Sequence, residues 1–327
     1  MRKFTYSHAA YAFQAGRRLP GARCHPPMSG IAKTPDDSKG HFMRLDENHR
    51  RLSHVRRSRL LDLRVDDAER TVLKWAESLE DFEQAFRLVH DEYLRLGYLA
   101  APQASGMFYG VHHLLPTSAT LLLRTGGESV ATLTQILDTD LFGLPMDRLY
   151  RPELDRLRRR GRKLAELSAL ATCRRFRWRN FFMLLCRVMY HRAISKKVTD
   201  LCIMVNPKHA PFYRTIFLFE DIGPERDYPV LGAPAVALRV DLERIQERLA
   251  DRYRTFSTEF NVNAFLNFDL DERSLGLDLC NGERRPVPLD RDAIHHFLCR
   301  EPMSLKDLAP EQRGNVHHLC PQPRRPH

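Results

Sequence analysis

Glu166 interrupts an otherwise apolar run, residues 164–171, that has the length and composition of a buried strand. Because side chains alternate along a strand, Leu164 and Ser168 share the face of Glu166. An isolated ionised carboxylate is costly to bury, so Glu166 must be paired, hydrated or functional. A functional Glu166 would act as a base, directly or through water, on a group that must lose a proton before it reacts. The alternative is a structural ion pair with a core-facing arginine.

Tyr213 and His209 belong to one short stretch, residues 206–213, with the sequence NPKHAPFY. Its Asn-Pro pair ends the preceding strand, and a short helix is expected over residues 210–217. A buried tyrosine there either takes part in chemistry or packs with its hydroxyl hydrogen-bonded. His209 is a candidate proton carrier or acceptor-binding residue, and the alternative is a residue that caps its turn.

Four arginines gather where the Glu166 strand is expected to pass into the next helix: Arg174, Arg175, Arg177 and Arg179. Free backbone N–H groups and the helix dipole favour phosphate at a helix N-terminus. Guanidinium groups added there suit a phosphate group and an acidic partner surface. A solvated basic turn is the alternative.

Asp138 ends an expected strand, where it either holds an ammonium group or forms a turn. The seven cysteines are scattered and odd in number, which indicates free thiols in a reducing compartment. Cys173 lies near the Glu166 strand but has no neighbouring histidine, so we do not assign it as a nucleophile. The spacing of the histidines and cysteines after residue 290 fits no standard zinc pattern, so we expect no metal site.

The elements that would position these residues alternate between strand and helix. Strands are expected over residues 71–76, 119–124, 129–137, 164–171, 201–205 and 233–240. Ser78 and Asp81 form a capping box that begins a helix closed by Gly97. Further helices are expected over residues 151–162, 181–189, 210–217 and 242–253. The order β-α-β-β-(α)-β-α-β-α-β predicts an α/β (α+β) fold with a mixed central sheet flanked by helices.

The chain has 327 residues, of which 43% are apolar, and a net charge of +11 that is concentrated in two segments. Residues 1–64 carry +9 and residues 147–197 carry +12, whereas the remainder is acidic. Gly and Pro punctuate residues 1–64 without any hydrophobic period, which predicts a disordered basic tail whose deletion leaves activity intact. That tail could contact anionic lipid at a membrane surface. No apolar run approaches the ~18 residues of a membrane span, and no secretory signal is visible, so we expect a cytoplasmic protein.

Four blocks of sequence resemble long-chain N-acyl amino acid synthases of the GNAT acyltransferase superfamily, which are related to acyl-homoserine-lactone synthases and exosortase-associated acyltransferases. These blocks are SVATL with Asp138 and GLPM (residues 129–146), GRKLAELS (161–168), VNPKHAPFY (205–213) and GAPAVAL (232–238). The resemblance covers roughly residues 70–242. Two departures stand out: Ala169 occupies the position where the related synthases usually carry Arg, and no Gly-rich phosphate loop follows the Glu166 strand.

The resemblance implies a GNAT-like fold and an EC 2.3.1 acyltransferase without a tightly bound cofactor. An acyl carrier protein thioester, or acyl-CoA, would donate a long-chain acyl group to the α-amine of an amino acid by direct attack. Glu166 and Tyr213 would be catalytic, with Tyr213 protonating the leaving thiolate. Asp138, Ser168 and His209 would bind the acceptor. Arg174, Arg175, Arg177 and Arg179 would bind the phosphopantetheine phosphate and the acidic face of the carrier protein. The helices containing Phe82, Phe86 and Phe181 would line an acyl tunnel.

Two other functions remain open. One is synthesis of an acyl-homoserine-lactone-type autoinducer, with S-adenosylmethionine as acceptor. The other is nucleic-acid binding without catalysis, through the basic segments. This function would account for neither Glu166 nor the NPKH…Y run, so we expect no nucleic-acid partner. The predicted organisation is a tail (1–64), an acyltransferase domain (65–242) and a helical or irregular C-terminal extension (243–327).

Overall fold

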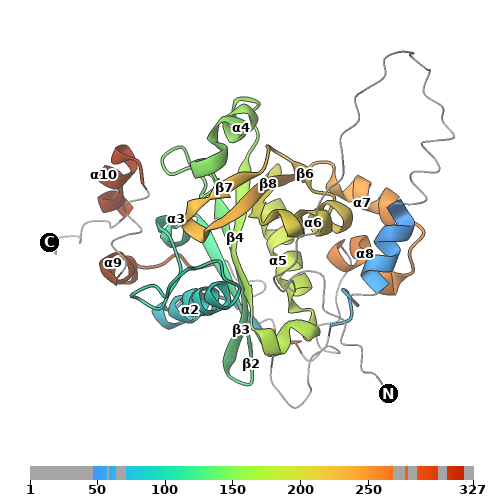
Figure 1. Ribbon diagram of the computed structural model, residues 1–327, viewed down its shortest axis with the longest axis horizontal. Coiled ribbons are helices and arrows are strands. Elements are labelled where there is room, and N and C mark those ends of the chain that lie inside the picture. Colours follow the sequence, from blue (N-terminus) through green and yellow to red (C-terminus); the bar gives the residue numbers. More distant parts are fainter. Residues whose placement is uncertain are drawn as a thin grey trace, which may run out of the picture.

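The computed structural model describes residues 47–56, 59–63, 71–267, 277–278, 286–300 and 308–319. Its centre is one mixed sheet with strand order β6-β8-β5-β4-β3-β2-β1-β9, and β7 pairs with the outer part of β8 (Figure 1). The strands are β1 (Thr71–Trp75), β2 (Ser118–Thr125), β3 (Glu128–Leu137), β4 (Leu164–Thr172), β5 (Asp200–Val205), β6 (Glu220–Asp221), β7 (Arg226–Tyr228), β8 (Ala233–Asp241) and β9 (Leu277–Asp278). The mixed sheet and its flanking helices confirm the predicted fold class.

Helices cover both faces of this sheet. They are α2 (Leu79–Arg95), α3 (Val111–Leu114), α4 (Asp147–Arg159), α5 (Phe181–Ser195), α6 (Ala210–Ile216), α7 (Ile245–Tyr253), α8 (Val262–Asn267), α9 (Arg291–Arg300) and α10 (Pro310–Leu319). Short 3-10 helices follow β4 (η1, Arg174–Arg179) and β5 (η2, Pro207–His209). None of the described helices has the length and apolarity that a membrane crossing requires.

Local sequence signals account for several elements. Ser78 accepts a hydrogen bond from the Asp81 N–H, and the Asp81 side chain accepts from the Ser78 N–H, which completes the capping box of α2. Gly126 and Gly127 take positive φ angles of 57° and 83° in the β2–β3 hairpin. The predicted start of α2 and the predicted hairpin are therefore confirmed.

Side chains alternate between the two faces of the sheet along each strand, so the core has one apolar layer on each face. Leu121 and Leu133 pack in the cluster that includes α5, whereas Leu122 packs with Phe82 and Phe86 of α2 on the other face. Along β4, Ala165 lies on the α5 side and Leu164 on the α4 side. Glu166 therefore faces the layer that contains α2 and α4.

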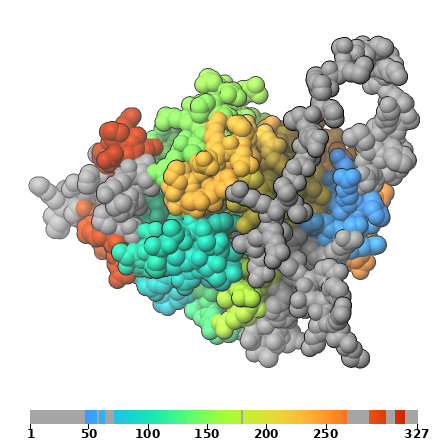
Figure 2. Space-filling view, viewed as in Figure 1, coloured from blue at the N-terminus to red at the C-terminus, as the bar shows by residue number. Residues whose placement is uncertain are grey.

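The segment before β1 corrects part of the predicted disordered tail. Residues 47–56 are helical, and Val55 and Leu60 are 0% and 5% exposed in the main core cluster. Arg51 donates from Nε to the Thr215 carbonyl oxygen over 2.7 Å and stacks on the Tyr253 ring. Figure 1 shows this helix in blue beside α7 and α8, and Figure 2 shows it on the surface of the same part of the molecule. The apolar residues of this segment pack against residues far along the chain, so no local sequence pattern predicts their burial. Residues 1–46 lie outside the described residues.

The segment after β8 also contributes to the same core. Ile245, Leu249 and Tyr253 of α7 and Leu266 of α8 are buried in the cluster that contains α5. Farther on, the Phe297 ring of α9 makes an edge-on contact with the Phe86 ring of α2. The division at residue 242 remains a prediction, although the helices after it share their core with the sheet.

Candidate active site

Two neighbouring strands separate at the centre of the sheet. β4 and β5 pair in parallel only from Leu164↔Asp200 to Leu167↔Ile203, and both strands continue beyond the last pair. On its other edge β4 carries a bulge, because Ser168 pairs with Thr134 and Ala171 pairs with Thr132. The bulge contains Ala169, whose φ of 54° bends the strand. This geometry opens a gap between β4 and β5 just past Glu166.

Glu166 is buried beside this gap, with 2% of its surface exposed. Its Oε2 accepts a hydrogen bond of 2.9 Å from the Met146 N–H. Within the described part of the chain, no lysine or arginine pairs with Glu166, and the charged groups that act on it are Asp147 and Asp138. Burial, with a smaller contribution from these carboxylates, raises the pKa of Glu166 to about 8. The alternative of an arginine ion pair is therefore not what the structure shows.

The loop that carries Met146 is fixed by one arginine. Arg158 of α4 binds Asp138 through Nε (2.7 Å), Asp147 through Nη2 (2.6 Å) and Asp155 through Nη1 (2.8 Å). Asp147 Oδ2 also accepts from the Leu144 N–H over 2.7 Å. Gly143 lies directly against the Asp147 side chain. A Cβ at position 143 would be 2.3 Å from Asp147 Oδ2, so the site leaves no room for a larger residue. This network holds the Met146 N–H against Glu166.

Asp138, predicted to bind the acceptor, is engaged in this network instead. Both of its carboxylate oxygens accept from Arg158, at 2.7 and 2.9 Å. It lines a polar cavity with Arg158 and Lys163 that is separate from the cavity of Glu166. The structure therefore does not bring Asp138 together with the other predicted site residues.

A mostly apolar cavity of about 200 Å³ begins at Glu166 and passes through the gap to the α5 side of the sheet. Glu166, Ser168, His209 and Tyr213 all line it, so four of the predicted residues meet there. On the α5 side its wall includes Phe182, Cys186, Tyr190, Leu201, Phe217, Val240, Leu242, Ile245, Leu249 and Leu266. Both expected tunnel helices line the cavity, α5 through several residues and α2 through Tyr93. Phe82 and Phe86 of α2 do not line it, because they pack under α9.

Tyr213 lies among aromatic rings in this cavity. It packs against Phe182, Phe212 and Phe219 with ring centroids 5.3–6.4 Å apart. Burial raises its pKa well above the usual value, with smaller effects of Cys186, Tyr93 and Tyr98. A phenol in this setting keeps its proton, which suits a hydrogen-bond donor better than a proton source.

His209 is held at the cavity rim beside Tyr98. The Tyr98 hydroxyl and His209 Nε2 are hydrogen-bonded over 3.3 Å. Burial, and then the charge of Lys208, lower the pKa of His209 to about 4, so the imidazole is neutral at pH 7. An imidazole with so low a pKa is a weak base, but it can still accept a hydrogen bond from an acceptor molecule.

Sequence reasoning missed three tyrosines of this site, Tyr93, Tyr98 and Tyr228, all of which line the cavity. Tyr93 belongs to the apolar stripe of α2, where a tyrosine is indistinguishable from a core residue. Tyr98 and Tyr228 come from separate loops and short strands. No spacing in the sequence connects them with Glu166.

The predicted donor-binding arginines divide into different roles. Arg177 donates to Glu92 Oε2 over 2.6 Å, and Arg175 pairs with Glu128. Arg174 is exposed, while its backbone N–H donates to Glu92 over 3.2 Å. The side chain of Arg179 lies outside the described residues. None of the three described arginines lines the cavity itself.

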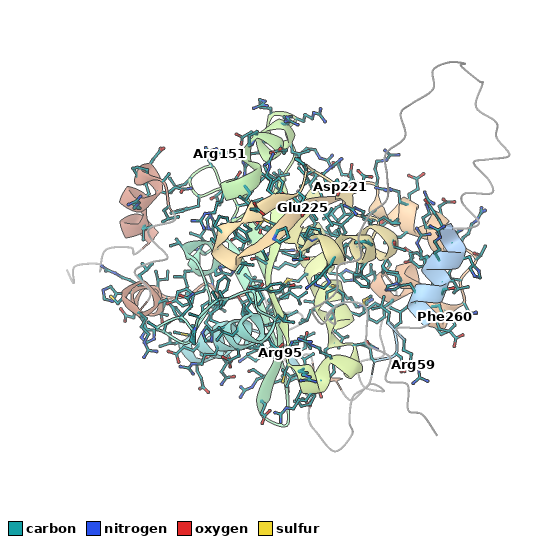
Figure 3. The ribbon with its side chains drawn as sticks, in the orientation of Figure 1. Arg59, Arg95, Arg151, Asp221, Glu225 and Phe260 are labelled. Carbon is teal, nitrogen blue, oxygen red and sulfur yellow. The ribbon has the colours of Figure 1, made fainter. Side chains whose placement is uncertain are left out.

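A basic rim nevertheless lies beside the cavity at this edge. The positive charge of Arg177 acts on the Tyr98 hydroxyl, and the Lys208 ammonium lies 5.5 Å from the centre of the Tyr98 ring. The exposed arginines of α4 lie at the opposite end of the molecule, as the positions of Arg151 and Arg95 show (Figure 3). The +12 segment is therefore two separate basic surfaces.

Neither of the two cysteines near the site has a partner among the described residues that would activate it. Cys186 lines the cavity, and burial raises the pKa of its thiol, which keeps it protonated. Cys173 is a free, partly buried thiol packed against the main core. Neither cysteine has the neighbouring base that a thiolate nucleophile requires in the described part of the chain.

Comparison of the sequence with known families gives one match. Residues 84–241 match the family described as N-acyl amino acid synthase FeeM. The matched region runs from within α2 to the last residue of β8, so it includes Glu166, the β4–β5 gap and the NPKH…Y run. The helices α7 to α10 lie beyond it. No protein of curated function matches the sequence significantly.

Three solved structures illustrate the range of similar chains. FeeM, an N-acyl amino acid synthase from uncultured soil microbes, is 29% identical, over 55% of this chain and 94% of its own, with a TM-score of 0.49. BjaI, a CoA-dependent acyl-homoserine lactone synthase, is 17% identical, over 57% of this chain and 91% of its own, with a TM-score of 0.43. A putative N-acetyltransferase from Lactobacillus plantarum is 13% identical, over 53% and 98%, with a TM-score of 0.37.

Proposed function

We propose, on the premise that residues 84–241 form an N-acyltransferase domain of the FeeM N-acyl amino acid synthase family, that this chain acylates the α-amine of an amino acid. The donor would be a long-chain acyl thioester. The single observation that carries this proposal is the position of Glu166, a buried carboxyl without a cationic partner among the described residues, at the head of an apolar cavity.

Glu166 has the properties that a base for an amine needs. The α-amino group of an amino acid is protonated at neutral pH, so it must lose a proton to become a nucleophile. A carboxylate whose pKa is raised to about 8 accepts that proton at a smaller free-energy cost than an ordinary glutamate does. An ordinary glutamate, with a pKa near 4.3, would be a much weaker base.

The reaction would proceed by direct attack. Glu166 takes one proton from the bound ammonium, and the resulting neutral amine forms a C–N bond to the thioester carbonyl. The C–S bond breaks, the sulfur leaves as a thiolate, and the second nitrogen proton passes to that sulfur. Backbone N–H groups of β4 beyond its last pair with β5 are suitably located for the carbonyl oxygen. Tyr213 would donate a hydrogen bond to the leaving sulfur, because a thiolate with a pKa of about 8.5 does not require a full proton transfer from the phenol.

The cavity supports a long apolar acyl group rather than acetyl. Its wall on the α5 side is formed almost entirely by Leu, Ile, Val and Phe side chains. Each methylene buried there would contribute about 0.8 kcal/mol to donor binding. The thioester carbon would lie at the β4–β5 gap and the chain would extend toward α7.

A carrier protein is the donor form that the rim favours. Arg174 is exposed, and Lys208 and Arg177 lie around Tyr98 at the same edge. Such a surface is complementary to an acidic acyl carrier protein and to the phosphate of its phosphopantetheine. The segment after β4 has no Gly-rich loop for the diphosphate of CoA.

The amino-acid acceptor would bind on the Glu166 side of the gap. Ser168 shares this cavity with Glu166, and neutral His209 lies at its rim. We propose that these two side chains orient the acceptor amine toward Glu166. Asp138 would act indirectly, through Arg158 and the loop that carries Met146.

The test is a donor and acceptor screen with mass-spectrometric detection. Purified full-length protein is incubated with acyl carrier proteins loaded with C4 to C18 acyl groups, or with the matching acyl-CoAs, and a mixture of amino acids. We expect N-acyl amino acids from long-chain acyl carrier protein. Acyl-homoserine lactone formed from S-adenosylmethionine would support the related synthase activity instead. Folded protein that makes no product with any pair would contradict the proposal.

A further inference from the structure

Residues outside the family-matched region line the apolar cavity at the end away from the β4–β5 gap. Ile245 and Leu249 of α7 and Leu266 of α8 line it, and all three are at most 4% exposed. The match ends at residue 241, the last residue of β8. The wall of the cavity is therefore completed by a segment that the matched domain does not supply.

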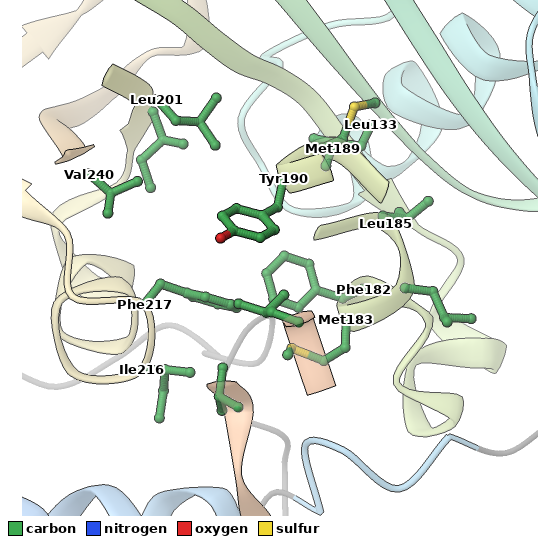
Figure 4. Close-up of a cluster of buried hydrophobic side chains, with 14 of the residues drawn as sticks. Leu133, Phe182, Met183, Leu185, Met189, Tyr190, Leu201, Ile216, Phe217 and Val240 are labelled. Atoms are coloured by element: carbon green, nitrogen blue, oxygen red, sulfur yellow. The ribbon is translucent and has the colours of Figure 1, made fainter. Parts of the chain in front are cut away.

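These residues lie along the cavity well away from the gap. Val205 is at the open end of β5 and Leu201 is four residues back toward its start, which corresponds to about 13 Å along a strand. Leu201 and Val240 are register partners in the deep wall, and Leu242 follows β8 directly. Figure 4 shows Leu201 and Val240 grouped with Tyr190 and Phe217 around this space.

Helix α8 is fixed in place by helix α5. Arg187 donates to the Phe265 carbonyl oxygen, and His191 donates from Nε2 to the Leu266 carbonyl oxygen over 2.8 Å. The Tyr190 hydroxyl donates to Asn267 Oδ1 over 3.3 Å. The last carbonyl groups of a helix lack partners within the helix, so these contacts from α5 satisfy them and hold the Leu266 side chain against the cavity.

We infer that α7 and α8 form a fixed end wall, with Leu249 and Leu266 at its surface, that limits the length of the acyl chain this protein accepts. This inference rests on the proposed acyltransferase function, because it takes the acyl chain as the occupant of the cavity. An apolar chain gains affinity for every methylene that it buries. A methylene that meets a tightly packed end wall instead gains nothing and forces side chains out of place.

The test is a binding experiment that does not require turnover. The full-length protein is titrated with saturated fatty acids of increasing length that displace a bound fluorescent fatty acid. We expect affinity to rise about fourfold for each added methylene until the chain reaches the wall, and to stop rising there. Leu266→Ala should move this limit to longer chains, and Leu266→Phe should move it to shorter ones.

Val262→Ala is the matched control. Val262 is on the same helix and is 0% exposed, but it does not line the cavity, so its truncation tests for a general loosening of α8. We expect it to leave the limiting length unchanged. The inference is wrong if the Leu266 variants keep the limiting length of the wild type, if Val262→Ala shifts it equally, or if no fatty acid binds.

The same experiment separates this inference from the proposed function. If the limit shifts as expected but no N-acyl amino acid forms in the donor and acceptor screen, the end wall is supported and the synthase activity is not. If product forms but its chain-length distribution is the same for wild type, Leu266→Ala and Leu266→Phe, the activity is supported and the end wall is not.

Discussion

The Met146 N–H donates to Glu166 Oε2 over 2.9 Å, and it is the hydrogen bond that the described structure gives this buried carboxyl. One donor stabilises the ionised form too little to offset burial, so the pKa remains about 8. A second donor or an arginine would have lowered it into the usual range of glutamate. The site therefore keeps a weakly acidic carboxyl where an amine must be deprotonated.

Glu166 should make the folded state less stable as the pH rises. Its pKa is about 8 in the folded protein and about 4.3 in the unfolded chain, so folding takes up a proton between these values. The stability that protonated Glu166 contributes to the folded state is fully present below pH 4 and is lost progressively as the pH rises through 8. In thermal unfolding at pH 8, Glu166→Gln should have a higher Tm than the wild type. Between pH 5 and pH 8, Tm should fall less in Glu166→Gln than in the wild type. An equal pH dependence in both proteins would contradict the raised pKa.

Arg158 should tune the pH profile of catalysis without contacting the cavity of Glu166. The wild-type rate should rise with pH toward a plateau above about 8 as Glu166 ionises. Arg158→Gln would leave Asp138 and Asp147 uncompensated, and both carboxylates already raise the pKa of Glu166. We expect the midpoint of kcat/KM against pH to move upward, by about one unit.

The control for this measurement is Arg239→Gln. Arg239 pairs with Asp200 and Glu220, away from the Met146 loop. It should lower stability while leaving the midpoint in place. If kcat/KM has the same pH midpoint in Arg158→Gln and the wild type, the Asp138–Arg158–Asp147 network does not influence the pKa of Glu166.

Much of the fold could be predicted because its signals are local. The Ser78–Asp81 box, the Gly126-Gly127 turn and the apolar run around Glu166 each lie within a few residues of sequence. Glu166 could be identified as a candidate site residue because a carboxylate within an apolar strand is costly to bury. The long-range pairings were not: Asp138 and Arg158 are 20 residues apart, and Arg51 reaches Thr215 across the whole domain.

Deletion of residues 1–64 should destabilise the protein. The sequence predicts that this deletion is harmless, but Val55 and Leu60 are buried in the main core and Arg51 bonds to the end of α6. Removal of two buried apolar side chains costs several kcal/mol, with about 2–5 kcal/mol for Leu60→Ala alone. Thermal denaturation of the shortened and full-length chains measures the loss. A shortened chain with unchanged Tm would show that residues 47–63 contribute nothing to the core.

The rim beside Tyr98 should control the affinity for an acyl carrier protein. Arg174→Glu and Lys208→Glu reverse exposed charges at this edge, so KM for the carrier should rise about tenfold while kcat changes little. The same reversal at Arg159, an exposed residue of α4 at the other end, is the matched control and should have little effect. Equal effects of all three variants would indicate general electrostatic attraction instead of a docking surface.

The most direct test of the central claim is N-acyl amino acid formation by wild type and Glu166→Gln, measured by mass spectrometry with long-chain acyl carrier protein and amino acids at pH 8. Glu83→Gln, a carboxylate outside the cavity that pairs with Arg87 and His296, is the control and should retain activity. We predict that Glu166→Gln is folded and about 100-fold or more slower, as expected for loss of a general base. Turnover of folded Glu166→Gln at the wild-type rate would contradict the account.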